Sequence, residues 1–105
     1  MQIEISTDNH IKGSAKLEEV VKELTTHGLQ HFASHITRVE VHLADENGSR
    51  STPDDKRCTM EARVEGRKPT VATAHADTVE VAVRGAATKL ARVLESELGR
   101  LEARR

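Results

Sequence analysis

The sequence predicts an α+β domain in which a four-stranded sheet is covered on one face by two helices. Two observations carry this prediction: three segments alternate apolar and polar residues and are followed by a fourth, short segment of small residues, and two longer segments repeat apolar residues every three or four positions. Their order along the 105 residues is β-α-β-β-β-α. We expect this sheet to be antiparallel and apolar on one face, and such a sheet needs a cover, which two amphipathic helices supply. We therefore expect a two-layer sandwich, with residues 1–105 forming one domain.

The first strand and the first helix are expected in the first third of the chain. Residues 2–6 alternate Ile3 and Ile5 with polar neighbours, which is typical of a short strand with one buried face. Ser14 is a plausible N-cap for the helix that follows. Gly28 costs that helix about 1 kcal/mol relative to alanine, unless it lets the helix approach the sheet closely. The apolar stripe of the helix is Leu17, Val20, Val21, Leu24, Gly28 and Phe32.

The middle of the chain is expected to form an antiparallel meander of three strands. Residues 36–46 and 57–66 alternate clearly, whereas residues 70–76 are small on both sides and leave their facing open. The residues expected to face the core are Val39, Val41, Leu43, Cys58, Met60, Ala62 and Val64.

A long second helix should complete the sandwich. Asp77 is a candidate N-cap, and the pattern continues to about Arg104. The apolar stripe of this helix is Val79, Val83, Ala86, Leu90, Leu94, Leu98 and Leu101.

Composition excludes several ways of binding nucleic acid. The chain has 16 basic and 17 acidic residues, so its formal net charge is -1. A protein that binds nucleic acid through phosphate contacts alone is usually clearly basic. Any nucleic-acid binding by this chain must therefore come from local clusters of basic residues or from complementary shape. Phe32 is the only aromatic residue, and single-strand binders that stack bases need several.

Cysteine content and hydropathy bear on the compartment. The lone Cys58 excludes an intramolecular disulfide and is expected to be a buried thiol. The N-terminal stretch is polar, and no run approaches the ~20 apolar residues of a membrane span. We expect a cytoplasmic protein that does not act at a membrane.

No motif in the sequence predicts catalysis or a bound metal. His27, His31 and His35 are spaced by four, but a zinc site needs further ligands and a supporting shell, so we expect exposed histidines. Asp54 and Asp55 are expected to form a solvated turn. The glycines match no phosphate-binding pattern. We therefore expect no enzyme activity, cofactor, metal or small-molecule substrate.

The remaining candidates are basic side chains on the helices and in a hairpin turn. Side chains of this kind can bind phosphates regardless of sequence. Spacing alone favours the alternative, a solvated helix surface of mixed charge. The candidates are Lys22 on the first helix, Arg67 and Lys68 in the turn, and Arg84, Lys89, Arg92 and Arg100 on the second helix.

Several segments together carry a family resemblance. They are the opening MQIEISTDNHI, a first helix that ends in Phe32 before ITRVEVHL, the segment DKRCTMEARVEG, and finally HADTVEVAVRGAATKLARVL. In this order and spacing they resemble the ribosome hibernation promoting factor and ribosome-associated inhibitor family, in its short, single-domain form. The resemblance covers nearly all of the chain.

The resemblance implies a fold and a function. The fold would be similar to a double-stranded-RNA-binding domain with an added leading strand. The protein would bind the small ribosomal subunit and its ribosomal RNA, in the cleft used by messenger and transfer RNA. Translation would be blocked by occupancy, without chemistry, under stress or in stationary phase. Because the chain ends at Arg105, the extra dimerising domain of long forms is expected to be absent, leaving a monomer or weak homo-oligomer.

The family's basic helix positions correspond best to Lys22, Lys89 and Arg92. A further basic cluster is usual about one turn later, where this chain has Glu95 and Glu97.

An alternative is a diverged protein-interaction module of the same fold that no longer binds ribosomes. It would use the charged outer face of the sheet. The residues of that face are Arg38, Glu40, Glu61, Arg63 and Glu65.

Overall fold

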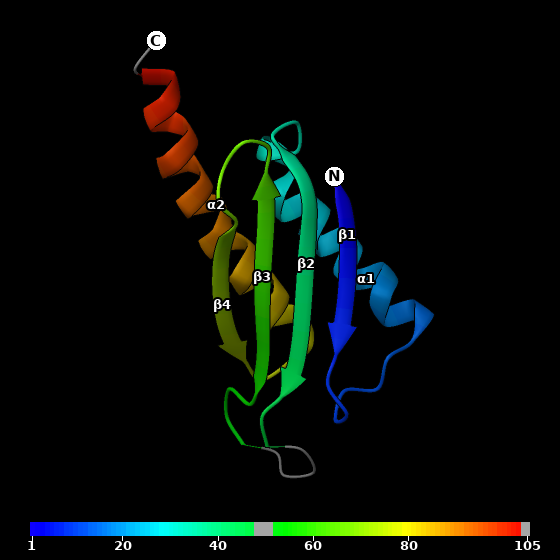
Figure 1. Cartoon of the computed structure of the whole chain (residues 1–105). Coiled ribbons are helices and arrows are strands. Elements are labelled where there is room, and N and C mark those ends of the chain that lie inside the picture. The colour runs from blue at the N-terminus through cyan, green and yellow to red at the C-terminus, as the bar shows by residue number, and fades with distance from the viewer. Residues whose placement is uncertain (48–51, 104–105) are drawn as a thin grey trace.

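Two layers make up the structure, a four-stranded sheet and a pair of helices packed on one of its faces (Figure 1). The computed structural model describes residues 1–47 and 52–103, with side chains described as far as Gly99. The predicted order β-α-β-β-β-α is confirmed. The elements are β1 (Gln2–Thr7), α1 (Ala15–Leu29), a single 3₁₀ turn η1 (Gln30–Phe32), β2 (Ile36–Asp45), β3 (Lys56–Val64), β4 (Thr70–Ala76) and α2 (Val79–Ala103).

The sheet is mixed, with the strands in the order β1-β2-β3-β4. β2, β3 and β4 form the expected antiparallel meander. β1 pairs with β2 in parallel, with Ile3 beside Val39, so the expectation of a wholly antiparallel sheet was wrong. The reason is that α1 returns the chain to the end of the sheet from which β1 started. A parallel pair requires such a crossover, and a helix usually supplies it.

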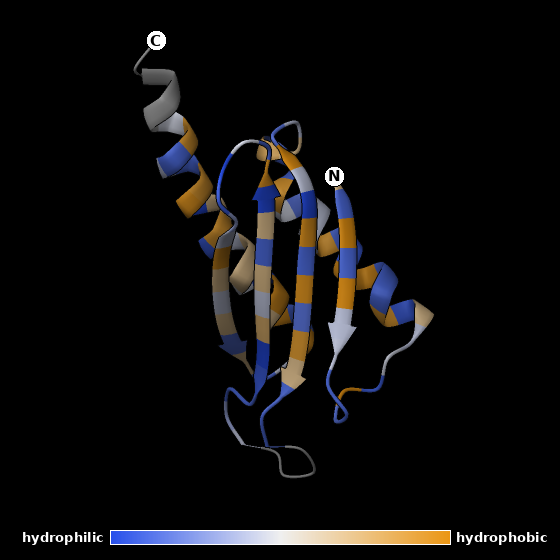
Figure 2. Ribbon diagram, in the orientation of Figure 1, coloured by the Kyte–Doolittle hydropathy of each residue, from blue (hydrophilic) through white to orange (hydrophobic). Residues whose placement is uncertain are grey.

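Alternation along the strands places the core between the sheet and the helices. Bands of hydrophobic and hydrophilic colour succeed each other along β2 in Figure 2. The predicted inward residues of β2 and β3 are all buried. The structure also determines the facing of β4, where Thr70, Ala72, Ala74 and Ala76 are buried. These residues are small because α2 passes close to them: a Cβ added at Gly85 would lie 3.0 Å from the Cβ of Ala74.

Side-chain caps begin both helices. The Ser14 hydroxyl accepts a hydrogen bond from the Leu17 N–H at 3.0 Å, which confirms the predicted cap of α1. In α2 the cap is Thr78 instead of Asp77. The Thr78 hydroxyl accepts from the Val81 N–H at 3.2 Å. The carboxylate of Asp77 instead accepts from the backbone N–H of Asp54 at 2.7 Å, which ties the start of α2 to the loop before β3.

The two helices approach each other closely at Gly28. A Cβ added there would lie 2.7 Å from the Cβ of Ala87 on α2. The glycine therefore allows close contact with the other helix, and not the close approach to the sheet that the sequence had left open. α1 buries Val21 and Leu29 completely, and Thr25 as well, which its polar side chain does not predict.

Replacing Gly28 with alanine should destabilise the fold. The added methyl group must displace α2, and overpacking of this kind costs about 1–3 kcal/mol against about 1 kcal/mol gained in helix propensity. We expect Gly28→Ala to lower the free energy of unfolding in urea. Gly99→Ala is the matched control, because nothing lies within 4 Å of a Cβ added there. Equal or higher stability of Gly28→Ala relative to Gly99→Ala would contradict the packing described above.

The loop between β2 and β3 is fixed by a buried carboxylate. Asp55 accepts hydrogen bonds from the Lys56 ammonium at 2.7 Å and from the Thr52 N–H at 3.1 Å. Lys56 also lies 3.3 Å from a carboxylate oxygen of Asp45. The expectation of a solvated Asp54–Asp55 turn was wrong for Asp55, since only 2% of its side chain is exposed. Asp54 is exposed and has φ 56°, in the left-handed region.

This arrangement makes stability depend on pH. The hydrogen bond from Lys56, followed by that from Thr52, lowers the pKa of Asp55 below its ordinary value. A depressed pKa gives stability that is present above the unfolded pKa of about 3.9 and is lost as pH falls through the folded pKa. In urea unfolding, the stability difference between wild type and Asp55→Asn should therefore stay constant from pH 8 to 5 and shrink below about pH 4. A difference that persists unchanged to pH 2.5 would contradict this assignment.

Candidate nucleic-acid interface

The exposed surface of α2 carries two basic residues in one row. Arg84 and Arg92 are exposed and eight residues apart, which in a helix is a rise of about 12 Å and a net rotation of about 80°. The neutral, exposed Thr88 lies between them. Arg84 and Arg92 therefore point away from the buried stripe of Val83, Leu90 and Leu94, and can meet a partner approaching the helix layer.

Lys89 lies on the flank of α2 that faces the edge of the sheet. Its ammonium group donates a hydrogen bond to the backbone carbonyl of Thr73 in β4 at 2.9 Å. The side chain remains exposed, so it can still meet an anion. The structure thus gives Lys89 a second role, in holding α2 against β4, that the sequence does not reveal.

Lys22 lies on α1, apart from the α2 row. Six residues separate it from Gly28, which in a helix is a rotation of about 120° away from the side that touches α2. Glu18, one helical turn earlier, and Glu23 are exposed beside it. The structure does not bring Lys22 together with Arg84 and Arg92, and its surroundings are of mixed charge.

Arg67 and Lys68 are exposed in the turn between β3 and β4. Gly66 makes this turn with φ +76°, and the Arg67 N–H donates to the Val64 carbonyl at 3.1 Å. The turn lies at the opposite end of β4 from the start of α2 (Figure 1), and so far from Arg84. The side chain of Arg100 lies outside the described residues. The predicted cations therefore spread along the molecule instead of forming one cluster.

On the outer face of the sheet, by contrast, cations pair with acids. Glu40 lies directly opposite Glu61 across β2 and β3, an unfavourable pairing of like charges. Arg38 compensates it with a hydrogen bond to Glu40 at 2.6 Å, and Arg63 approaches Glu40 to 3.7 Å. The bond from Arg38 lowers the pKa of Glu40 and raises that of Arg38. Nearby, Arg57 lies 3.4 Å from Glu46.

The helix layer and the β3–β4 turn differ from this outer face in one respect. Within residues 1–47 and 52–99, none of the predicted cations on α1, on α2 or in the turn forms an ion pair. These charges are Lys22, Arg67, Lys68, Arg84, Lys89 and Arg92. They can therefore meet an external anion without breaking an ion pair to a described residue, although Lys89 also holds its hydrogen bond to the Thr73 carbonyl.

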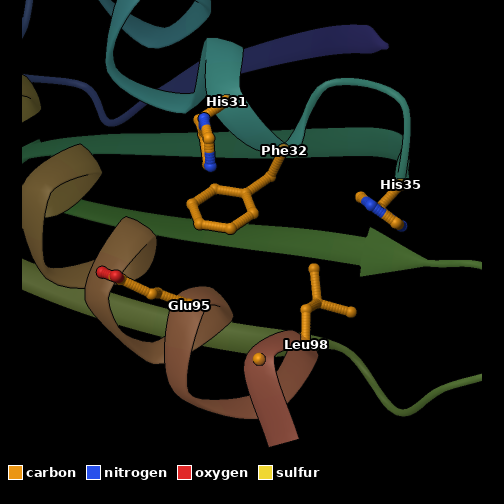
Figure 3. Close-up of a pocket in the computed structure, with 6 residues that line it drawn as sticks. His31, Phe32, His35, Glu95 and Leu98 are labelled. Atoms are coloured by element: carbon orange, nitrogen blue, oxygen red, sulfur yellow. The ribbon is translucent and has the colours of Figure 1, made fainter. Parts of the chain in front are cut away.

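A hollow lies between η1 and the C-terminal half of α2. It encloses about 300 Å³ and is lined by His31, Phe32, His35, Glu95, Leu98 and Gly99. Phe32 and Leu98 provide its apolar wall, while the histidines and Glu95 provide polar groups (Figure 3). The spacing of His31 from His35 and of Glu95 from Gly99 is one helical turn in each pair, but the sequence could not show that the two pairs face each other.

The described part of the chain contains no candidate metal site. No group of three or more His, Cys, Asp or Glu side chains there could hold a metal ion. Cys58 is fully buried, and burial raises the pKa of its thiol to about 12, so the thiolate needed for nucleophilic attack is scarce. His27 is exposed and does not line the hollow. Within the same residues, no helix has both the length and the apolarity to cross a membrane.

The fold, and cations that form no ion pair within the described residues, define a small α+β domain whose helix side can meet an anionic partner. The sequence matches, over residues 3–102, the family described as sigma 54 modulation protein / S30EA ribosomal protein. The chain belongs to this family, which confirms the resemblance found in the sequence.

Two solved structures have the same fold. A ribosomal subunit interface protein from Coxiella burnetii superposes with a TM-score of 0.75 at 17% identity, covering 94% of this chain and 99% of that chain. The N-terminal domain of Protein Y from Thermus thermophilus superposes with a TM-score of 0.66 at 11% identity, covering 89% of this chain and 99% of that chain. No curated protein matches the sequence significantly.

Replacing Lys89 or Arg92 should affect stability differently, because only Lys89 holds α2 against β4. Lys89→Met removes the hydrogen bond to the Thr73 carbonyl, and we expect the free energy of unfolding to fall by about 0.5–1 kcal/mol. Arg92→Met removes an exposed cation that forms no ion pair with a described residue, and stability should change by less than about 0.5 kcal/mol. Urea unfolding of both variants measures the difference. Equal stabilities would show that the Lys89 bond contributes nothing in solution.

Proposed function

We propose that this protein is a non-catalytic, ribosome-associated factor of the cytoplasm. As one domain, it would bind the small ribosomal subunit and its ribosomal RNA, and block translation under stress or in stationary phase. Membership of a family described as ribosomal protein supports ribosome association. So does the printed name of the Coxiella burnetii structure, a ribosomal subunit interface protein of the same fold.

The observation that carries the proposal is the division of charge between the two faces. Arginines of the outer sheet face are paired with acids, whereas Arg84 and Arg92 on the helix layer form no ion pair with a described residue. A near-neutral protein can bind RNA when its unpaired cations lie on one side. The proposed contact is therefore the exposed side of the helices, with phosphates held by arginine and lysine. Such contacts position the protein without reading a base sequence.

The acidic residues after Arg92 limit where the RNA can lie. Glu97 is engaged inside the protein, because its carboxylate accepts a hydrogen bond from the Thr70 hydroxyl at 3.2 Å. Glu95 has no hydrogen bond or ion pair to any described residue, and its charge would repel a phosphate. We therefore place the RNA over the N-terminal half of α2, around Arg84 and Arg92, with Lys89 at its margin.

Binding alone would account for the effect on translation. The proposal requires no substrate and no chemical step, since a domain seated in the messenger and transfer RNA cleft excludes other occupants by volume. The alternative, a protein-interaction module that uses the outer sheet face, gains no support from the geometry. Arg38, Glu40 and Arg63 already satisfy one another there, so a partner would have to compete with these pairs.

Charge reversal on α2 tests this proposal. Arg84→Glu combined with Arg92→Glu should abolish co-sedimentation with small subunits at low salt, because four units of charge change on the proposed contact. Wild-type binding should weaken steeply between 50 and 200 mM salt, as expected for ionic contacts with phosphates. Sucrose-gradient sedimentation with purified subunits measures both effects.

The matched control makes the same change of charge on the other face. Arg57→Glu combined with Arg63→Glu lies on the outer sheet face and should leave sedimentation close to wild type, with circular dichroism confirming that both variants fold. If the two double variants lose binding equally, the net charge of the protein, and not the charge of its helix face, determines binding to the small subunit. If the wild type fails to sediment with small subunits at low salt, the proposal is lost.

A further inference from the structure

The hollow between η1 and α2 has a composition suited to a particular kind of ligand. One wall is apolar, formed by Phe32 and Leu98, and Gly99 leaves space beside it. His31 and Phe32 come from η1, His35 from the segment before β2, and Glu95 and Leu98 from α2 (Figure 3). The rings of His31 and Phe32 meet edge to face, with centroids 5.1 Å apart, so the position of each is constrained.

The charge of the hollow favours a cation. Among the described residues that line it, Glu95 is the only acidic one, and no hydrogen bond or ion pair links its carboxylate to another described residue. Glu97, two residues later, is instead occupied by the Thr70 hydroxyl. The hollow thus offers a carboxylate without a partner among the described residues, an apolar wall and flat imidazole rings. An arginine side chain matches all three features, because its planar guanidinium pairs with carboxylates and stacks on flat rings, and its stem is apolar.

We propose that this hollow binds an arginine side chain from a basic segment of a protein partner. The guanidinium pairs with Glu95 and stacks against an imidazole of His31 or His35, and the methylene stem lies on Leu98. The volume of about 300 Å³ is ample for one such side chain. This inference concerns a protein ligand and does not depend on whether the helix face binds ribosomal RNA.

Nucleic acid fits the same hollow less well. Glu95 repels the phosphate that accompanies every base, and Phe32 is only 9% exposed, which leaves little ring surface for a stacked base. Lysine is also a poorer match than arginine. Its ammonium is a compact, strongly hydrated charge that cannot stack on an imidazole plane.

A peptide titration of the intact chain tests the inference. The probe is acetyl-Gly-Arg-Gly-amide, followed by nitrogen–proton NMR and by the ring resonances of the histidines. We expect saturable shifts confined to residues that line the hollow. The corresponding citrulline peptide, which has the same shape without the charge, should bind at least about five-fold more weakly, as should the lysine peptide.

Two variants make the test specific to the pocket. Glu95→Gln should weaken binding of the arginine peptide about five-fold while the spectrum remains that of the folded protein. Glu97→Gln is the matched control, since it removes the same charge two residues away and keeps a group able to accept from Thr70. It should bind as the wild type does.

Three results would overturn the inference. One is the absence of saturable shifts at the hollow, and another is equal binding by Glu95→Gln and wild type. The third is that guanosine monophosphate, titrated in the same way, shifts the lining residues while the arginine peptide does not, which would assign the hollow to nucleic acid. Because no ribosome is present, a negative result here leaves the sedimentation experiment unaffected, and the converse also holds.

Discussion

The close contact of α1 with α2 is the constraint on which the rest of the structure depends. Two helices must share one apolar face of a four-stranded sheet, and there is room only if their backbones approach each other and the sheet. Gly28 against Ala87 brings the helices together, and Gly85 against Ala74 brings α2 onto β4. The small residues at these contacts contribute little apolar surface to the core. The rest of the core is filled by large, fully buried side chains, those of Leu29, Met60, Leu90 and Leu94.

This packing also determines which charged side chains are available to an external partner. With both helices behind the sheet, the outer strand face is left to polar side chains that stand in register across β2 and β3. Registered side chains lie close enough to pair, and Arg38 and Arg63 meet Glu40 in this way. On the helix layer, Arg84 and Arg92 form no ion pair with a described residue, so both charges are available to an anion.

The sequence predicted the element order and most of the core because the periodicities are strong. Three features were beyond it. The parallel pairing of β1 depends on the path of a whole helix, and the role of Gly28 depends on what lies opposite it. Asp55 looked like a turn residue because its partners, Lys56 and the Thr52 N–H, appear only once the loop closes.

For the candidate site, the sequence identified the basic positions but not their grouping. Arg84 and Arg92 share a row that helical spacing can predict. The bond from Lys89 to Thr73 joins residues 16 apart, and the hollow joins His35 to Glu95; neither contact has a local signal. Contacts between distant segments are the part that spacing cannot provide.

The bond from Lys89 also bears on aggregation. β4 is an edge strand, and the unpaired carbonyls of an edge are a template on which a strand of another molecule can add. Lys89 occupies the Thr73 carbonyl and places a hydrated charge beside it, while Val71 is exposed nearby on the same strand. A lysine at this point discourages sheet extension from β4. The same side chain therefore helps to keep the protein from polymerising through its edge, whatever it binds elsewhere.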